Sequence, residues 1–255
     1  MVAVDWSGDA RAESTPHPKL WAAEAHDGEP LSLAPTSRMG VVQRLVALAE
    51  ADPHLLVALD FSFSFPRWFV EARGFTSGPE VWPHAATLDR RASPFFGWKG
   101  SRRPAHELLF RSCEEHARAD GFHPSSTFQV NGPGSVGTGS VLGMAHLVVL
   151  RAAGFAIWPW DPVIEGVPVV VEGYPRAFAR SVVKSDPAVR AAHVATLGLR
   201  DAALAAHAIA SDDAFDAAVM ALGLMTFAAS ATPWPTVAAP ADVVRAEGWM
   251  LRPES

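Results

Sequence analysis

The chain contains one cysteine, Cys113, so it can form neither an internal disulfide nor a cysteine-based zinc site. It also lacks any apolar run close to the roughly 20 residues that a membrane-spanning helix needs. No basic and apolar leader precedes the first strand-like residues. These absences predict a cytoplasmic protein without membrane association, in which Cys113 is a structural thiol.

Several catalytic motifs are missing as well. The ten histidines form no H-E-x-x-H pair, which argues against a zinc hydrolase, and the chain has no G-x-S-x-G nucleophile elbow and no P-loop. The formal net charge is −6, which argues against a protein that coats nucleic acid by neutralising phosphates nonspecifically. Any contact with nucleic acid must therefore come from a local concentration of basic residues.

The composition favours a single α/β domain. With 255 residues, of which 49% are hydrophobic, the chain can bury a large core, and it contains no repeat, low-complexity tract or interdomain linker. Short apolar runs and helical periods together predict a mixed central sheet with flanking helices. Residues 66–140 are broken by proline and glycine, so we expect one domain, residues 1–255, with an insertion after the Asp60 strand.

The expected elements follow from the periodicity of the apolar residues. Strands are predicted at residues 2–5, 20–25, 31–33, 55–60 and 167–172, the second and third being part of an N-terminal meander. Helices are predicted at residues 38–51, 104–118, 140–153, 187–196, 201–209 and 214–229. Residues 61–65 alternate phenylalanine with serine, which places the serines and Asp60 on one face and the phenylalanines on the other.

Three of the predicted strands end in an acid, namely Asp5, Asp60 and Glu172. Each acid alone is also typical of a turn after a strand, but ligands of open α/β sheets gather at strand ends, so together the acids predict a shared site. Carboxylates that are packed together repel one another and lose hydration, which favours a bound divalent cation. We therefore expect metal-dependent chemistry on phosphate.

Asp216 is the most informative acid. It is the only charged residue in the helix predicted at residues 214–229, and that helix is apolar on all sides, so a buried carboxylate there needs a cation. Asp212 and Asp213 precede it by four and three residues, on the same helical face. Acids that follow a cap such as Ser211 are also typical of a first turn stabilised by the helix dipole.

One segment is basic although the chain as a whole is acidic. Between Asp89 and Arg111 there are six basic and two acidic residues, with Phe95, Phe96 and Trp98 among them. Guanidinium groups bind phosphate and aromatic rings stack on bases, which predicts contact with a single strand or a junction; a solvated loop with packing aromatics is the alternative. The basic residues are Arg90, Arg91, Lys99, Arg102, Arg103 and Arg111.

A dinucleotide fingerprint is the competing motif. Gly132, Gly134 and Gly137 match G-x-G-x-x-G between a strand-like segment at 127–130 and a predicted helix, and Asp161 follows 24 residues after the last glycine. A proline inside the motif removes one backbone amide. A loop that cradles phosphate beside the acids is therefore the second interpretation.

Together, the elements and motifs resemble a known superfamily. The meander, the acid-ended strands and a terminal helix with the pattern D-x-x-D-A are similar to ribonuclease H-like proteins, and residues 213–217 resemble the terminal-helix motif of Holliday-junction resolvases. Four short segments stand in order along the chain: V-D-W-S-G at 4–8, L-D-F-S-F-S-F-P at 59–66, E-G-Y-P at 172–175 and E-G-W at 247–249. Together they resemble domain-of-unknown-function family 429, which consists of predicted nucleases of that superfamily.

The resemblance implies a ribonuclease H-like fold and a metal-dependent nuclease. One or two Mg²⁺ or Mn²⁺ ions would activate water against a phosphodiester bond of DNA or RNA, single-stranded or branched, or of a small phosphoester. Glu172 would be an outer ligand or would orient the water, and no lysine or histidine lies near these motifs, so the general base is unassigned. The implied metal ligands are Asp5, Asp60, Asp216 and either Asp213 or Asp212. The residues expected to contact substrate are Ser7, Ser62, Arg90, Arg91, Lys99, Arg102 and Arg103.

Two other functions fit the same motifs. Sugar kinases and chaperone ATPases share the core fold, and in a nucleotide-binding phosphotransferase Ser7, Gly8 and the loop at 132–139 would hold nucleotide phosphates. A noncatalytic module that binds nucleic acid or protein without a metal is the other alternative.

Overall fold

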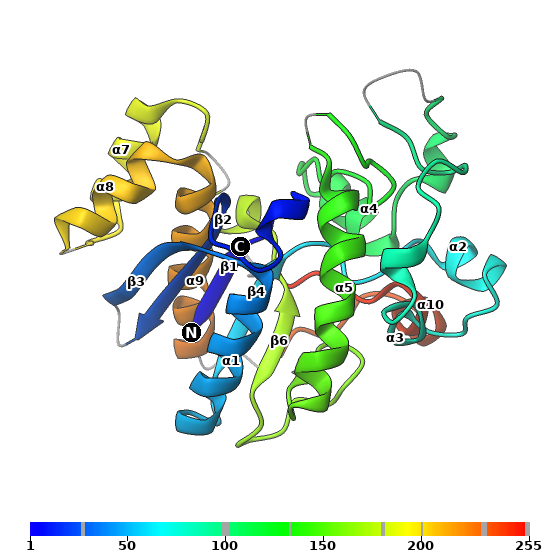
Figure 1. The fold of residues 1–255 in the computed structure, drawn as a ribbon, viewed down its shortest axis with the longest axis horizontal. Coiled ribbons are helices and arrows are strands. Elements are labelled where there is room, and N and C mark those ends of the chain that lie inside the picture. The colour runs from blue at the N-terminus through cyan, green and yellow to red at the C-terminus, as the bar shows by residue number, and fades with distance from the viewer. Residues whose placement is uncertain are drawn as a thin grey trace.

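The computed structural model describes residues 1–26, 29–97, 102–132, 134–179, 182–199, 201–230 and 234–252. Its centre is a six-stranded sheet with the order β3-β2-β1-β4-β6-β5 (Figure 1). The strands are β1 (Val2–Asp5), β2 (His17–His26), β3 (Glu29–Thr36), β4 (Leu56–Asp60), β5 (Ala156–Ile157) and β6 (Val169–Glu172). β2 runs antiparallel to β1 and β3, and all other pairs are parallel. The predicted α/β class with a mixed sheet is confirmed.

The central strands β1, β4 and β6 consist of valine, leucine and alanine, apart from the acid that ends each one. Strands that helices cover on both faces have this near-continuous apolar character. β2 and β3 pair as the predicted meander, and both extend beyond the ranges predicted for them.

Helices cover both faces of the sheet (Figure 1). On one face, α1 and α5 share a core with Val4, Val57 and Leu59, and on the other α9 packs against Ala3 and Ala58. None of the helices within the described ranges is long and apolar enough to cross a membrane. The helices are α1 (Arg38–Ala51), α2 (Arg67–Ala72), α3 (Gly78–Val81), α4 (Ser112–Ala119), α5 (Val136–Ala152), α6 (Pro175–Phe178), α7 (Pro187–Thr196), α8 (Ala202–Ala210), α9 (Asp212–Ala229) and α10 (Ala241–Glu247).

The segment between β4 and α5 carries many aromatic residues into the core that α1 and α5 share with the sheet. The three phenylalanines of residues 61–65 all enter this core. Phe128 packs against both Phe65 and Phe69, with ring centroids 5.6 and 5.1 Å away. The predicted insertion therefore has no separate core of its own among the described residues.

The prediction of a single helix at residues 104–118 is wrong. The structure has a short 3-10 turn, His106–Leu108, and then α4, because Arg111 adopts an extended backbone with φ −77° and ψ 160°. The Arg111 N–H donates a 2.9 Å hydrogen bond to Oε2 of Glu114, so the residue caps α4 instead of continuing a helix into it.

Candidate metal centre

Asp5 and Asp60 end neighbouring parallel strands. β1 and β4 pair with Asp5 opposite Asp60, so the two side chains emerge on the same face of the sheet. Two residues earlier on each strand, Ala3 and Ala58 pair in the same register and belong to the core beneath α9. The strand ends therefore bring these two acids together, as the sequence predicts.

Asp216 comes from the helix that covers this face. Ser211 caps α9, and its Oγ accepts a 3.2 Å hydrogen bond from the N–H of Ala214. Asp216 lies in the second turn and is buried. Carboxylate oxygens of Asp5, Asp60 and Asp216 lie within 4.8 Å of one another, close enough to hold one metal ion. We call these three residues the acidic triad.

The acidic triad is electrostatically unfavourable without a cation. Burial, reinforced by the charges of Asp60 and Asp216, holds the pKa of Asp5 well above its usual range. Burial also raises the pKa of Asp60 to about 7, with the charge of Asp216 contributing. The pKa of Asp216 rises to about 6 through burial, although Lys184 opposes the shift. A divalent cation would compensate this concentration of negative charge.

Lys184 is the site residue that the sequence does not reveal. It lies between α6 and α7, 32 residues before Asp216, and its ammonium donates a short hydrogen bond to Oδ2 of Asp216. Its side chain is 34% exposed, whereas that of Asp216 is 4% exposed. No lysine lies near the acidic motifs along the sequence, and it is the packing of the segment between α6 and α7 beside α9 that brings Lys184 to Asp216.

Glu172 stands apart from the acidic triad. β6 pairs with β4 so that Glu172 lies opposite Leu59, one residue before Asp60, and its side chain therefore leaves the opposite face of the sheet. There Glu172 is buried, its Oε2 accepts a 2.9 Å hydrogen bond from the Phe63 N–H, and Arg111 binds both carboxylate oxygens. Glu172 therefore forms an ion pair with Arg111, and its predicted role as an outer ligand or a residue that orients water stays a prediction.

The two acids at the start of α9 lie outside the triad. Asp213 is half-buried, and its charge contributes to the raised pKa of Asp5 without Asp213 joining the three clustered carboxylates. Asp212, one residue earlier, is exposed.

The two serines expected to bind substrate have different surroundings. The Ser7 hydroxyl accepts a 3.2 Å hydrogen bond from the Asp9 N–H within the loop after β1. Ser62 lines a cavity of about 370 Å³ that opens beside the triad. The lining also includes Asp60, Asp216, His123, Tyr174, Arg176 and Lys184. The described cavity therefore brings acids and cations together at the carboxyl ends of the parallel strands.

The basic segment divides into exposed and buried parts. Arg90, Arg91, Arg102 and Arg103 are exposed, and the guanidinium of Arg103 lies 5.8 Å from the ring centroid of Phe96. Arg111 is buried in its ion pairs with Glu114 and Glu172, so it cannot contact a nucleic-acid phosphate. Phe95 and Phe96 are core residues, 4% and 8% exposed, and not a stacking surface for bases. Trp98 and Lys99 lie outside the described residues.

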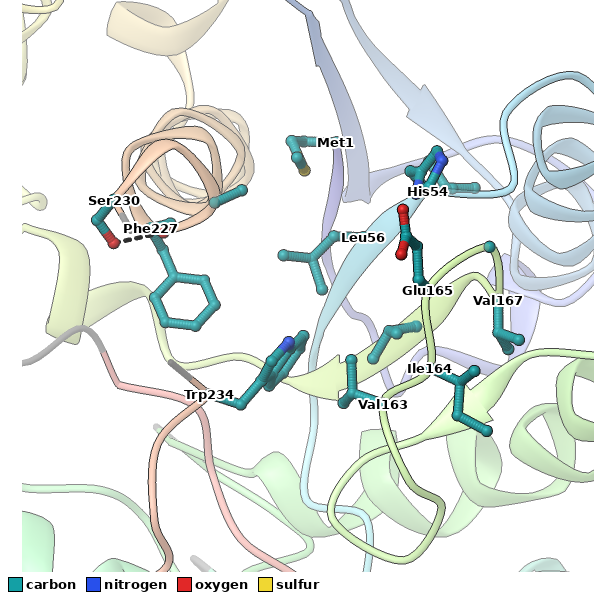
Figure 2. Close-up of a pocket in the computed structure, with 14 residues that line it drawn as sticks. Met1, His54, Leu56, Val163, Ile164, Glu165, Val167, Phe227, Ser230 and Trp234 are labelled. Atoms are coloured by element: carbon teal, nitrogen blue, oxygen red, sulfur yellow. Dashed lines mark hydrogen bonds between the residues drawn. The ribbon is translucent and has the colours of Figure 1, made fainter. Parts of the chain in front are cut away.

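A second cavity, of about 350 Å³, lies at the amino ends of the central strands, and Figure 2 shows the residues that line it. Met1 precedes β1, Leu56 begins β4 and Val169 begins β6, so this cavity faces the amino ends of the strands. Its walls include the side chains of Ile164 and Trp234 and are mostly apolar. The acidic triad, in contrast, lies at the carboxyl ends of the strands.

The structure argues against the dinucleotide fingerprint. Residues 127–130 are not a strand of the sheet, since Gln129 forms only an isolated bridge with Phe96. Asp161, which follows the motif by 24 residues where a ribose-binding acid would be needed, pairs with Arg151. Gly137 allows α5 to approach the 127–129 backbone closely, because a Cβ there would lie 2.2 Å from the Thr127 carbonyl oxygen.

Searches of family models, curated proteins and solved structures returned no match to this chain. The fold and the geometry of the acidic triad are therefore the grounds for a functional proposal.

Proposed function

We propose that this protein is a metal-dependent phosphodiesterase that hydrolyses nucleic acid. The observation that carries the proposal is the convergence of Asp5, Asp60 and Asp216 within 4.8 Å, from two central strands and the helix that covers them. Three oxygen donors of this kind suit the hard cations Mg²⁺ and Mn²⁺.

The topology supports a ribonuclease H-like fold. β1, β2 and β3 form an antiparallel meander. β4 and β6 extend the sheet from β1 and run parallel to it. Acids end the two central strands, and a late helix supplies the third. This is the arrangement that the resemblance to family 429 implies, and we include that relationship in the proposal.

The side chains at and around the acidic triad suggest a separate role for each group in the reaction. A bound cation would polarise the phosphate and lower the pKa of an attacking water. Asp5, Asp60 and Asp216 would hold it. Lys184 and Arg176 line the adjoining cavity, where cationic side chains attract a phosphate. The exposed guanidinium groups of Arg90, Arg91, Arg102 and Arg103 would contact the backbone of a longer strand.

Metal binding is the first test. Calorimetric titration with Mn²⁺ should give saturable binding that Asp5→Asn and Asp216→Asn each remove. Asp242→Asn is the matched control, because it removes an acid from an exposed ion pair with Arg67 and should leave the affinity unchanged. Equal affinity in the wild type and both triad variants would contradict the proposal.

Cleavage is the second test. A panel of single-stranded, duplex, hybrid and branched substrates should include at least one that is cut with Mn²⁺ or Mg²⁺, and Asp60→Asn should lower that rate by orders of magnitude while binding persists. Calcium, a larger ion with looser geometry, should support binding without turnover. Hydrolysis of ATP without cleavage of any nucleic acid would favour the phosphotransferase, and nucleic-acid binding without metal or turnover would favour the noncatalytic module.

A further inference from the structure

A tethered cation already contacts the acidic triad. Lys184 donates to Asp216, whereas Asp5 and Asp60 have no ion-pair partner among the described residues. A lysine side chain is ordinarily charged at neutral pH, so Lys184 brings a positive charge into contact with one of the three acids.

The backbone around Lys184 is held on both sides. Arg190 of α7 is 5% exposed, and its guanidinium donates to the Lys184 carbonyl oxygen and, at 2.9 Å, to that of Ile209. Arg176 donates a 2.8 Å hydrogen bond to the Val182 carbonyl oxygen. These bonds anchor the segment beside α9. The position of the Lys184 backbone next to the triad is thus built into the fold.

A divalent cation and the Lys184 ammonium compete for the same carboxylate. An Asp216 oxygen that accepts a hydrogen bond from the ammonium is not free to ligate a metal at the same lone pair. Two positive groups on one carboxylate also repel each other, and the repulsion is strong where water is largely excluded. Metal binding through the Oδ2 lone pair that Lys184 occupies therefore requires the ammonium to move, and the charge repulsion favours its departure if the metal binds elsewhere on the same carboxylate.

We propose that Lys184 holds the place of the metal: in the metal-free protein its ammonium occupies the position on Asp216 that a divalent cation takes. This inference rests on the proposed metal-dependent function. The displaced side chain stays at the cavity that Ser62 and Arg176 also line, where its charge meets an incoming phosphate. Lys184 thus stabilises the acids without metal and becomes a phosphate contact when metal binds.

The test compares Lys184→Met, which keeps the length of the side chain and removes its charge, with Lys184→Arg, which keeps the charge. Calorimetry with Mn²⁺ alone should show at least tenfold tighter binding to Lys184→Met than to the wild type, and an affinity for Lys184→Arg within threefold of wild type. Without metal, Lys184→Met should melt at a lower temperature, and saturating Mn²⁺ should raise its melting temperature more than that of the wild type.

Lys19→Met is the matched control. Lys19 is an exposed lysine of β2 that forms no ion pair with the three acids of the triad, so its loss should change Mn²⁺ affinity less than threefold. Equal or weaker Mn²⁺ binding by folded Lys184→Met, with binding by the wild type intact, overturns the place-holding role and leaves the proposed function standing. Absence of Mn²⁺ binding in all variants overturns both. If Lys184→Met does not fold, Lys184→Gln replaces it in the same comparison.

Discussion

At the scale of single residues, the pleat of the sheet decides which acids can meet. Asp5 and Asp60 lie opposite each other in register, so their carboxylates share a face. Glu172 lies opposite Leu59, and this offset of one residue sends its carboxylate to the other face, where Arg111 binds it. The three strand-end acids in the sequence therefore give two members of the acidic triad and one buried ion pair.

His146 provides a titration test of the loop that follows β1. The imidazole lies 3.4 Å from a carboxylate oxygen of Glu13 and packs edge-on against Trp6. Burial lowers the pKa of His146, while the charge of Glu13 opposes the shift. We expect NMR titration to give a pKa below the usual value of about 6.5, and Glu13→Gln to lower it further. Glu50→Gln, which changes an exposed acid of α1, should leave it unchanged.

The lowered pKa of His146 also fixes the sign of its effect on stability. The native state favours the neutral imidazole, so this contribution is fully present above the unfolded pKa of about 6.5 and is lost as the pH falls through the folded value. His146→Gln should therefore weaken the dependence of the free energy of unfolding on pH in that range. A pKa for His146 above 6.5 would contradict the assignment.

At the scale of elements, α5 approaches the backbone of residues 127–129 closely at Gly137. A Cβ at Gly137 would meet the Thr127 and Gln129 carbonyl oxygens at 2.2 and 2.8 Å, and backbone atoms cannot easily move away. We expect Gly137→Ala to lower the free energy of unfolding by about 1–3 kcal/mol in urea denaturation, the usual range for overpacking.

Gly139 on the same helix is the control for this prediction. A Cβ there would meet only ordinary contacts, at 3.5 Å from the Gly8 nitrogen and 3.6 Å from the Trp6 ring. Because alanine is the better helix former by about 1 kcal/mol, Gly139→Ala should leave the free energy of unfolding unchanged or slightly higher. Equal losses in the two variants would show that general loss of glycine in α5, and not the contact with 127–129, is responsible.

Elements with strong local signals were predictable. α1 spans residues 38–51 and α7 spans 187–196 as predicted, because each has a side-chain cap and an apolar period free of interruption. β5 has only two residues and no periodicity to detect, so it was missed. The prediction of one helix at 104–118 is wrong because the buried ion pair of Arg111 outweighs the helix propensity of the segment.

The candidate centre was predictable only in part. Asp5, Asp60 and Asp216 stand out because apolar surroundings make each carboxylate conspicuous in the sequence. Lys184 does not, because nothing in its neighbours indicates that α9 will lie against it. Composition likewise does not show which arginines of the segment ending at Arg111 are exposed and which one is buried with Glu172.

At the scale of the whole molecule, one core joins the sheet to the segment inserted after β4. Val4 and Leu59 of the sheet belong to the same buried cluster as Trp82 and Phe128. The pair between Arg111 and Glu172 links the start of α4 to the end of β6. We therefore expect a single unfolding transition, with coincident urea curves from tryptophan fluorescence and far-UV circular dichroism.

Breaking this ion pair should destabilise both regions together. Glu172→Gln removes one of the two acids that pair with the buried guanidinium of Arg111 and leaves Glu114 as the other, so we expect a loss of about 1–3 kcal/mol from weakened hydrogen bonds, with the two curves still coincident. Asp242→Asn, which removes an exposed partner of Arg67, should cost less than about 1 kcal/mol. Two separated transitions would mean that the inserted segment is an independent unit.

The burial of Cys113 makes the chain a convenient object for site-directed labelling. This single cysteine is 1% exposed, and burial raises the pKa of its thiol, so a native sample holds little reactive thiolate. A cysteine introduced at Arg90 or Arg102, both exposed, becomes the one group that a maleimide dye or photocrosslinker can reach. Whether nucleic acid binds near the basic segment, as we propose, can thus be tested without first replacing the native cysteine.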